Sequence, residues 1–309
     1  MERIDGEHFK VVRAEKKQTR NGDDYFILEL TNQERSLDAK IWSQNFGNCR
    51  YEEGRVIEVF GRLEEYNGKI SLVLESCQIV NSEEAVDFTP KIPTLVFDIE
   101  TVGQDFETLD QREQEYLLNN LTVEVEDKEK AKKRTSLFAI FAMVAAIGGW
   151  DVEQNKGKVL MATKKEVKLK NKNFIFQSCG DEKQLLEEFW KESLKFKKFV
   201  TYNGSSFDFP FLIIRSGVNR VKVPMSIKRY DNNFIDLQEK IRQKHGFKLE
   251  FLCRAFGIDN PKEMGIDGEK VSELYQEGKF QEIANYVAAD VTATVQLYQT
   301  WKEFMSGER

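Results

Sequence analysis

Hydrophobic and polar residues alternate in short runs through the first eighty residues of the chain. Alternation with a period of two puts one side of each run in a core and the other in solvent, which is typical of β-strands. Turn signals such as Asn21-Gly22 and Asn67-Gly68 separate the runs. Five short strands in so few residues favour a small closed barrel. The predicted strands lie at residues 8–19, 24–31, 35–43, 55–64 and 69–80.

The pattern changes after residues 81–91, a polar, proline-containing stretch that is typical of a linker. We therefore expect two domains, at residues 1–85 and 92–309. Strands mixed with helices in the second part indicate a layered α/β or α+β domain. Its predicted elements are strands at 94–100, 137–150, 158–163, 173–177 and 199–202, a charged helical insertion at 105–134, a helix at 181–196 and a mostly helical remainder.

Length and charge limit the possible functions. The 309 residues exceed the size at which one core usually keeps growing, which agrees with two domains. The net charge of −6 removes the simple argument that a basic protein binds nucleic acid. Residues 1–88 contain 12 Lys and Arg against 18 Asp and Glu, so this region accounts for the whole excess. A local basic groove elsewhere in the chain is compatible with this count.

Residues that bind metals through nitrogen or sulfur are scarce. The two histidines, His8 and His245, are far apart in the sequence. Four cysteines, at positions 49, 77, 179 and 253, are too scattered for a zinc site and are expected to be ordinary buried thiols. Any catalytic metal is therefore expected on oxygen ligands.

The sequence does not predict a membrane protein. Its longest apolar run, residues 137–150, is shorter than the roughly twenty residues that a membrane-spanning helix needs. The first residues are charged and resemble no secretory signal. A cytoplasmic location without a membrane partner is the expectation.

Two carboxylates lie on the apolar strand that opens the second domain. Asp98 and Glu100 are two residues apart, so their side chains point to the same face of the strand. Burying two like charges together is unfavourable unless a cation compensates them, and Mg²⁺ and Mn²⁺ prefer oxygen ligands. The pair therefore indicates a metal site. The alternative is that one carboxylate faces solvent at the end of the strand.

Another acidic residue follows the strand at residues 199–202. A glycine turn leads from this strand into a helix and puts Asp208 near the first helical turn. Asp208 is a candidate metal ligand. Its alternative role is to complement the positive end of the helix.

The last candidate pair lies in a long helix predicted from residue 280 to about residue 304. Tyr286 and Asp290 are four residues apart, so the phenol and the carboxylate share one face of the helix. Taken alone, the pair could equally be a buried tyrosine beside an ordinary aspartate.

Together, these three segments resemble the DEDD exonuclease superfamily in their order and context. The resemblance is to the predicted exonucleases related to the proofreading domain of family B DNA polymerases, and it covers about residues 93–303. The histidine subclass has a histidine five residues before the last aspartate, where this chain has Asn285. The resemblance is therefore to the tyrosine subclass, DEDDy. Supporting stretches lie at residues 234–237, 249–258 and 264–271.

The resemblance implies an α/β, ribonuclease H-like exonuclease domain that cleaves from the 3′ end. One metal ion would activate water and another would stabilise the leaving 3′ oxygen, releasing nucleoside 5′-monophosphates. Tyr286 would orient the attacking water. The expected cofactors are two Mg²⁺ or Mn²⁺ ions, held by Asp98, Glu100, Asp208 and Asp290.

The same resemblance implies a nucleic-acid substrate. Asn203 and Phe207 would position it, with Phe207 as a stacking or wedge residue. Packing in the core is the alternative for Phe207. Single-stranded DNA is the expected substrate, and a proofreading role would need a separate replication or repair partner. The alternatives are an exoribonuclease, or an inactive nucleic-acid-binding or scaffold protein on the same fold.

The predicted small all-β barrel resembles an OB-fold of the kind that precedes some exoribonucleases and synthetases. The strand order, Gly61 and the strand at residues 39–42 carry this resemblance. It implies that the barrel feeds single strands to the nuclease, although its acidic balance argues against tight binding of phosphates. The candidate stacking residues are Tyr25, Phe26, Trp42, Phe60 and Tyr66.

Two further features have simpler interpretations. Asp236, at a predicted helix start, is expected to cap that helix rather than to bind metal. The lysine-rich run at residues 164–172 could grip phosphates or could form a solvated hairpin or loop.

Overall fold

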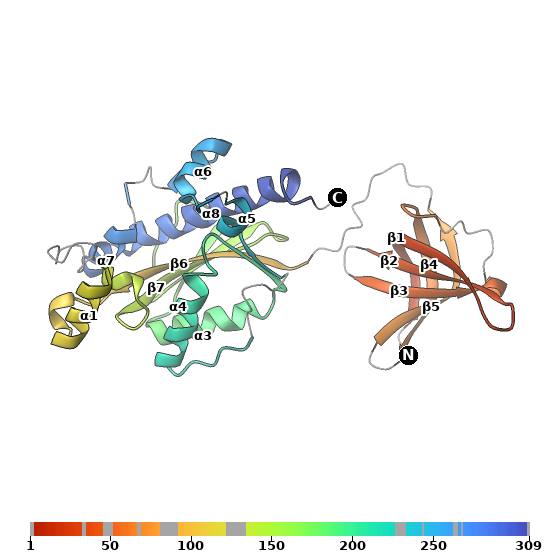
Figure 1. Cartoon of the computed structure of the whole chain (residues 1–309), viewed down its shortest axis with the longest axis horizontal. Coiled ribbons are helices and arrows are strands. Elements are labelled where there is room, and N and C mark those ends of the chain that lie inside the picture. Colours follow the sequence, from red (N-terminus) through yellow and green to blue (C-terminus); the bar gives the residue numbers. More distant parts are fainter. Residues whose placement is uncertain are drawn as a thin grey trace. The chain divides into compact units, whose positions relative to one another are not determined.

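The structure is a computed structural model that divides into two compact units, Met1–Lys91 and Ile92–Arg309 (Figure 1). No helix among the described residues combines the length and the hydrophobicity that crossing a membrane requires. The described residues are 3–32, 35–45, 52–66, 69–80, 92–121, 134–225, 233–242, 244–261, 265–266 and 268–307.

The first unit is a closed barrel of five strands, as predicted. Neighbouring strands are antiparallel except β3 and β5, which run parallel, and β4 pairs back with β1. β1 begins earlier than expected because its first residues pair with β4 on the far side of a bulge after Asp5. The strands are β1 (Arg3–Gln18), β2 (Asp24–Thr31), β3 (Ser36–Trp42), β4 (Val56–Tyr66) and β5 (Lys69–Ile79), in the order β1-β2-β3-β5-β4, with the short 3-10 helix η1 (Ser43–Asn45) after β3.

Alternate residues of each strand fill the barrel. Leu28 and Leu30 on β2 are fully buried, as are Leu72 and Leu74 on β5. The period-two pattern of the sequence therefore corresponds to one inward and one outward face on every strand.

An aromatic pair lies on the outward face of β2 and β3. The ring centroids of Tyr25 and Trp42 are 5.4 Å apart, and Lys40 Nζ lies 4.3 Å and 3.8 Å from them. Phe26, on the other face of β2, packs against the barrel core. The side chain of Tyr66 lies outside the described residues. The barrel thus presents only some of the predicted stacking residues.

One cysteine differs from the expectation. Cys77 on β5 is disulfide-bonded, so the prediction of a thiol is wrong at this position. Cys179 and Cys253 are free and buried, and Cys49 lies outside the described residues. Spacing along the chain argued against a zinc site, but it does not exclude a disulfide.

A mixed six-stranded sheet forms the centre of the second unit. β6, β10 and β11 run parallel, β7 is antiparallel to β6 and to β8, and β9 is parallel to β8. β6 therefore lies inside the sheet, with β10 and β7 on its two sides. The strands are β6 (Thr94–Gly103), β7 (Ala142–Asp151), β8 (Lys156–Met161), β9 (Phe174–Ser178), β10 (Lys198–Thr201) and β11 (Phe234–Asp236), in the order β11-β10-β6-β7-β8-β9.

Helices cover both faces of this sheet, α8 on one face and α3 and α4 on the other (Figure 1). Two cores result, and β6 contributes to both: Val96 lies in the core under α8, whereas Leu95 and Phe97 lie in the core under α3 and α4. The helices are α3 (Glu182–Ser193), α4 (Asp208–Val218), α5 (Leu237–Ile241), α6 (Leu249–Phe256), α7 (Gly268–Gln276) and α8 (Phe280–Phe304).

The charged stretch predicted as a helical insertion contains α1 (Gln111–Leu121), with 3-10 helices η2 (Phe106–Thr108) before it and η3 (Thr135–Leu137) after it. Residues 122–133 lie outside the described ones. The strand expected from residue 137 begins only at Ala142, because Phe141 packs with α1 and η2 in a small core of their own.

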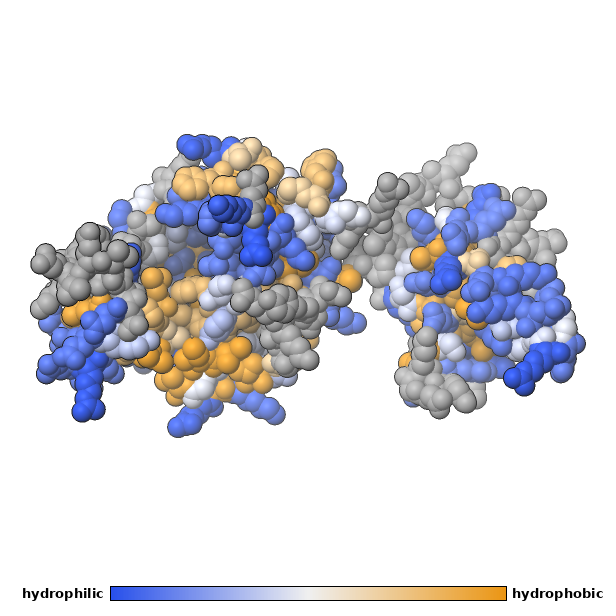
Figure 2. Space-filling view, viewed as in Figure 1, coloured by the Kyte–Doolittle hydropathy of each residue, from blue (hydrophilic) through white to orange (hydrophobic). Residues whose placement is uncertain are grey.

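The outer side of α4 is apolar. Ile213, Ile214 and Val218 are 43%, 44% and 55% exposed, and hydrophobic residues gather over α3 and α4 on the face shown in Figure 2. This apolar area lies on the side of the sheet away from α8.

Candidate metal centre

β6 directs Asp98 and Glu100 toward α8. Phe97 and Ile99 lie in the core under α3 and α4, and the carboxylates alternate with them, so they share the opposite face with Val96. Glu100 is 6% exposed and Asp98 is half-buried. Neither carboxylate is fully exposed, so the structure does not show the alternative in which one of them faces solvent.

α8 adds a third carboxylate and a phenol. Single carboxylate oxygens of Asp98, Glu100 and Asp290 all lie within 4.8 Å of one another. Tyr286, one helical turn before Asp290, is 4% exposed and lies near enough to Asp290 for the carboxylate to raise the pKa of the phenol. The first strand of the unit and its last helix thus meet at this point.

A glycine on β7 allows α8 to lie so close to the sheet. Gly148 pairs with Asp98, and a Cβ at this glycine would lie 2.8 Å from Val291 Cγ2 and 3.0 Å from Val287 Cγ2. Sequence analysis did not identify this residue. The available signal was the pair Gly148-Gly149 inside an apolar strand, where glycine often marks close approach of another segment.

Asp208 reaches β6 from the start of α4. β10 pairs with β6 as far as Val96, and further along the same edge the backbone N–H of Ile99 donates to Asp208 Oδ1 (3.1 Å). Asp208 is 3% exposed. It is not among the three carboxylates within 4.8 Å of one another, but its charge raises the pKa of Asp98. The fourth predicted ligand therefore flanks the other three.

The turn that leads to Asp208 is held by Asp236. Its carboxylate accepts hydrogen bonds from the backbone N–H groups of Asn203 (2.8 Å), Ser205 (3.0 Å) and Gln238 (3.0 Å) and from the Ser205 hydroxyl (2.6 Å). The bond from Gln238 caps α5, so the predicted cap is confirmed. The other bonds fix a turn in which Asn203 has a left-handed backbone, φ 66°. Sequence analysis missed this second role.

The two predicted substrate-positioning residues lie on the same turn. Asn203 is half-buried. Phe207 is also half-buried, and its ring packs against Phe211, 5.4 Å away, at the edge of the core under α3 and α4. The structure gives Phe207 the packing contact considered as its alternative. A substrate role for either residue stays a prediction.

Burial dominates the electrostatics of the cluster. It raises the pKa of Asp98 and Glu100 well above their ordinary values, and neighbouring carboxylates raise both further. Burial also raises the pKa of Asp208 to about 7, although backbone hydrogen bonds lower it. The pKa of Tyr286 is raised by burial and by the nearby carboxylates, so its phenol stays protonated.

These donors fit hard divalent cations. The clustered ligand atoms are carboxylate oxygens, and their accumulated negative charge favours a multivalent positive ion. Cys253 is close enough for Asp290 to influence it, but burial raises the pKa of its thiol to about 11, so it is a poor metal ligand. The site therefore suits ions such as Mg²⁺ or Mn²⁺.

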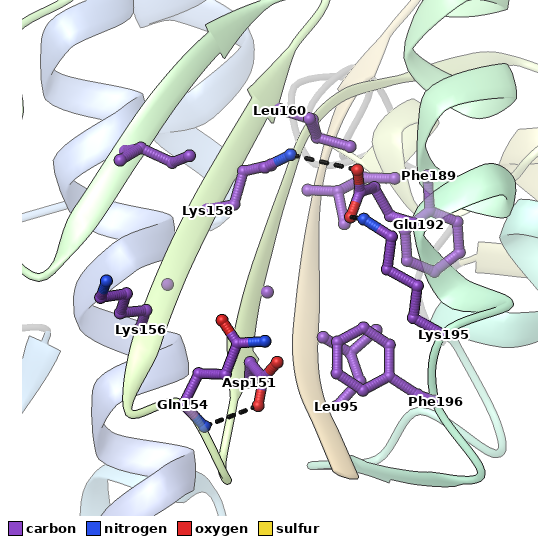
Figure 3. A pocket seen from close by; sticks show the side chains of 14 residues that line it. Leu95, Asp151, Gln154, Lys156, Lys158, Leu160, Phe189, Glu192, Lys195 and Phe196 are labelled. Carbon is purple, nitrogen blue, oxygen red and sulfur yellow. Dashed lines mark hydrogen bonds and ion pairs between the residues drawn. The ribbon is translucent and has the colours of Figure 1, made fainter. Parts of the chain in front are cut away.

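A separate cavity of about 270 Å³ lies on the other face of the sheet (Figure 3). Leu95 and Phe189 form part of its apolar floor. At its edge, Lys158 and Lys195 both contact Glu192, at 3.3 Å and 2.6 Å. Because Leu95 faces the core under α3 and α4, the sheet separates this cavity from the carboxylates.

Residues 157–308 match a protein family described as a predicted 3′–5′ exonuclease related to the exonuclease domain of PolB. The matched segment includes α4 and α8, which carry Asp208, Tyr286 and Asp290. This match supports a relation to the DEDD exonuclease superfamily. The resemblance inferred from the sequence motifs is thereby confirmed at this level.

One solved structure is similar to this chain in its fold. The family B DNA polymerase from the hyperthermophilic archaeon Pyrobaculum calidifontis is similar with a TM-score of 0.50 and 12% identity, over 96% of this chain and 46% of the polymerase chain. At this identity the similarity shows fold alone, and it supports a ribonuclease H-like second unit. This chain spans less than half of the polymerase. No curated protein sequence matches the chain.

We predict that Gly148→Ala weakens Mn²⁺ binding. The added methyl group would lie too close to Val287 and Val291, so α8 must move away from the sheet and carry Asp290 away from β6. We expect at least about a tenfold loss of affinity, as for other changes that misplace metal ligands. Isothermal titration calorimetry with Mn²⁺ measures the effect.

The matched control is Gly149→Ala, on the same strand but the other face. Its methyl group would meet the end of the Leu95 side chain at 3.2 Å, which can rotate away. Circular dichroism checks that both variants fold. Equal Mn²⁺ affinity in the two variants would contradict the spacing role of Gly148.

The raised pKa values predict how stability depends on pH when metal is chelated. An ordinary aspartate has a pKa near 4, so between about pH 4 and pH 7 the folded state binds a proton at Asp208 that the unfolded state has lost. Stability from this group is therefore present at low pH and is lost as pH rises through about 7. We expect Tm in EDTA to fall between pH 5 and pH 8. Asp208→Asn should flatten this slope, and an unchanged slope would remove Asp208 as its source.

Proposed function

We propose that the second unit, residues 92–309, is a metal-dependent 3′–5′ exonuclease of the tyrosine subclass. The observation that carries the proposal is the convergence of Asp98, Glu100 and Asp290 within 4.8 Å, with Asp208 beside them and Tyr286 next to Asp290 on α8. A buried cluster of acids opposes folding, which favours a functional reason for it. The family match over residues 157–308 supports the same reaction.

The reaction is hydrolysis of the last phosphodiester bond. A water oxygen bonds to phosphorus, the bond from phosphorus to the 3′ oxygen breaks, and that oxygen takes up a proton. A nucleoside 5′-monophosphate leaves, and the shortened strand keeps a new 3′-hydroxyl. Two bound divalent ions would supply the activated water and the stabilisation of the leaving oxygen. Their ligands would be Asp98, Glu100, Asp208 and Asp290.

The protein's own residues contribute positioning. The backbone N–H of Ile99 fixes Asp208, and Gly148 sets the distance between Asp290 and β6. Tyr286 is protonated at neutral pH because its pKa is raised, so it orients the attacking water and does not act as a base. Because these side chains are already in position, they need to move little during the reaction.

The first unit is proposed to be an OB-like module, residues 1–85, that binds single strands. The order β1-β2-β3-β5-β4 with closure between β1 and β4 supports this assignment. Tyr25, Trp42 and Lys40 form an external aromatic and cationic surface on β2 and β3, a combination that can stack on bases.

Single-stranded DNA is the proposed substrate, with Asn203 and Phe207 positioning its 3′ end. The related solved structure is a DNA polymerase, which favours DNA over RNA. In a proofreading role the chain would act together with a replication or repair protein. An exoribonuclease remains the second candidate because of the barrel, and an inactive scaffold the third.

We predict that Asp98→Ala abolishes cleavage. The experiment uses 5′-labelled single-stranded DNA, duplex DNA and RNA with Mg²⁺ or Mn²⁺. Wild-type protein should give a ladder that shortens from the 3′ end, and EDTA should stop it. The variant should be slower by at least about 100-fold, because it loses a ligand that touches the reacting centre.

The matched control is Glu187→Ala on α3, which removes an exposed carboxylate on the other side of the sheet. It should cleave like wild type. Equal cleavage by wild type and Asp98→Ala would remove the assignment of the site. Comparison of the labelled substrates decides between DNA and RNA.

A further inference from the structure

A loop rich in lysine lies beside the helix that carries Tyr286. This lysine loop is residues 164–172, between β8 and β9, and it contains five lysines and one acid, Glu166. All five lysines are exposed, and none forms an ion pair with the described residues. In a chain with a net charge of −6, this is a local concentration of positive charge. The lysines are Lys164, Lys165, Lys168, Lys170 and Lys172.

The lysine loop is anchored to α8 and to the core. Val167 and Leu169 pack against the core under α8. The backbone N–H of Lys170 donates to Asn285 Oδ1 (2.8 Å), and Asn285 is 7% exposed and directly precedes Tyr286 in the sequence. The loop is therefore solvated only in part, as the sequence allowed. Its apolar residues are packed against the core, and the lysines between them are exposed to solvent.

A groove begins at this loop and follows α8. It has a volume of about 420 Å³, and a second hollow of about 200 Å³ shares Asn171, Thr292 and Gln296 with it. Amide side chains dominate the polar lining of both hollows, and Asp259 is a carboxylate among them. We call this the amide groove; its main polar residues are Lys170, Asn171, Asn260, Asn285, Thr292 and Gln296.

The amide groove borders the catalytic face of α8. Ala289 and Ala293 line it. Ala289 follows Tyr286 by three residues and Ala293 follows Asp290 by three, and residues with this spacing are neighbours on a helix surface. A polymer in the groove would thus be in reach of the acidic cluster.

We propose that the lysine loop and the amide groove form the track along which a single-stranded nucleic acid reaches Tyr286 and Asp290. This inference rests on the proposed function and names its binding surface. The lysines contact phosphates, and the amides, which both donate and accept hydrogen bonds, contact sugars and base edges. An acidic peptide would pair with the lysines but would form fewer contacts with a groove lined by amides. Nucleic acid is therefore the better fit.

The test is a triple variant, Lys168→Gln, Lys170→Gln and Lys172→Gln, in the full chain. Binding of a fluorescein-labelled oligo(dT) is followed by anisotropy in EDTA, so that no cleavage occurs, over a range of salt concentrations. We expect a loss of affinity of at least about tenfold at low salt. The slope of log K against log salt should fall by roughly 2, because each lost phosphate contact on a single strand contributes about 0.7.

The control makes the same change of charge on the other side of the sheet, with Lys183→Gln, Lys191→Gln and Lys197→Gln. It should keep the wild-type affinity and slope. Wild-type affinity and slope in the lysine-loop variant would overturn the proposal, as would an oligoglutamate of equal charge that binds wild type as tightly as oligo(dT). Circular dichroism confirms that both variants fold.

A separate assay distinguishes failure of the track from failure of the proposed function. Hydrolysis of a thymidine 5′-monophosphate p-nitrophenyl ester by wild type with Mn²⁺ reports on chemistry alone. Loss of oligonucleotide binding in the lysine-loop variant, with no ester hydrolysis by wild type, would support the track and reject the exonuclease. Ester hydrolysis by wild type together with unchanged oligonucleotide binding in the variant would support the exonuclease and reject the track.

Discussion

Repulsion between closely packed carboxylates is the constraint around which the second unit is built. Asp98, Glu100 and Asp290 lie within 4.8 Å of one another, and burial raises the pKa of the first two well above the ordinary range. Such a cluster costs free energy in the metal-free protein, since it must either bind protons or hold charges that repel. Divalent cations held there would relieve that repulsion, so metal binding would stabilise the fold.

The rest of the unit keeps the carboxylates together despite this repulsion. The sheet fixes Asp98 and Glu100 on a central strand, and Gly148 lets α8 bring Asp290 against them. On the other edge of β6, an N–H group that would otherwise need a strand partner binds Asp208. Each acid is thus held by an element that is itself fixed by a hydrophobic core.

Sequence patterns predicted the parts of the site that depend on local periodicity. A period of two placed Asp98 and Glu100 on one face, and a spacing of four did the same for Tyr286 and Asp290. The closed barrel and a layered domain of strands and helices followed from the same patterns. The cap role of Asp236 was also accessible, because it depends on residues next to it in the chain.

Features that depend on contacts between distant segments were not predicted. The close approach at Gly148 requires knowledge of which helix crosses β7, and the bonds from Asp236 to the turn at residues 203–205 join two strands. The anchoring of the lysine loop by Asn285 is of the same kind. In each case the sequence shows the residue but not its partner.

The most direct test of this account is a crystal structure of the protein soaked in Mn²⁺, with anomalous scattering used to place the ions. Two ions about 3.5–4 Å apart are expected, with Asp98, Glu100, Asp208 and Asp290 as their ligands. Anomalous density located elsewhere, or these four carboxylates free of metal at saturating Mn²⁺, would contradict it.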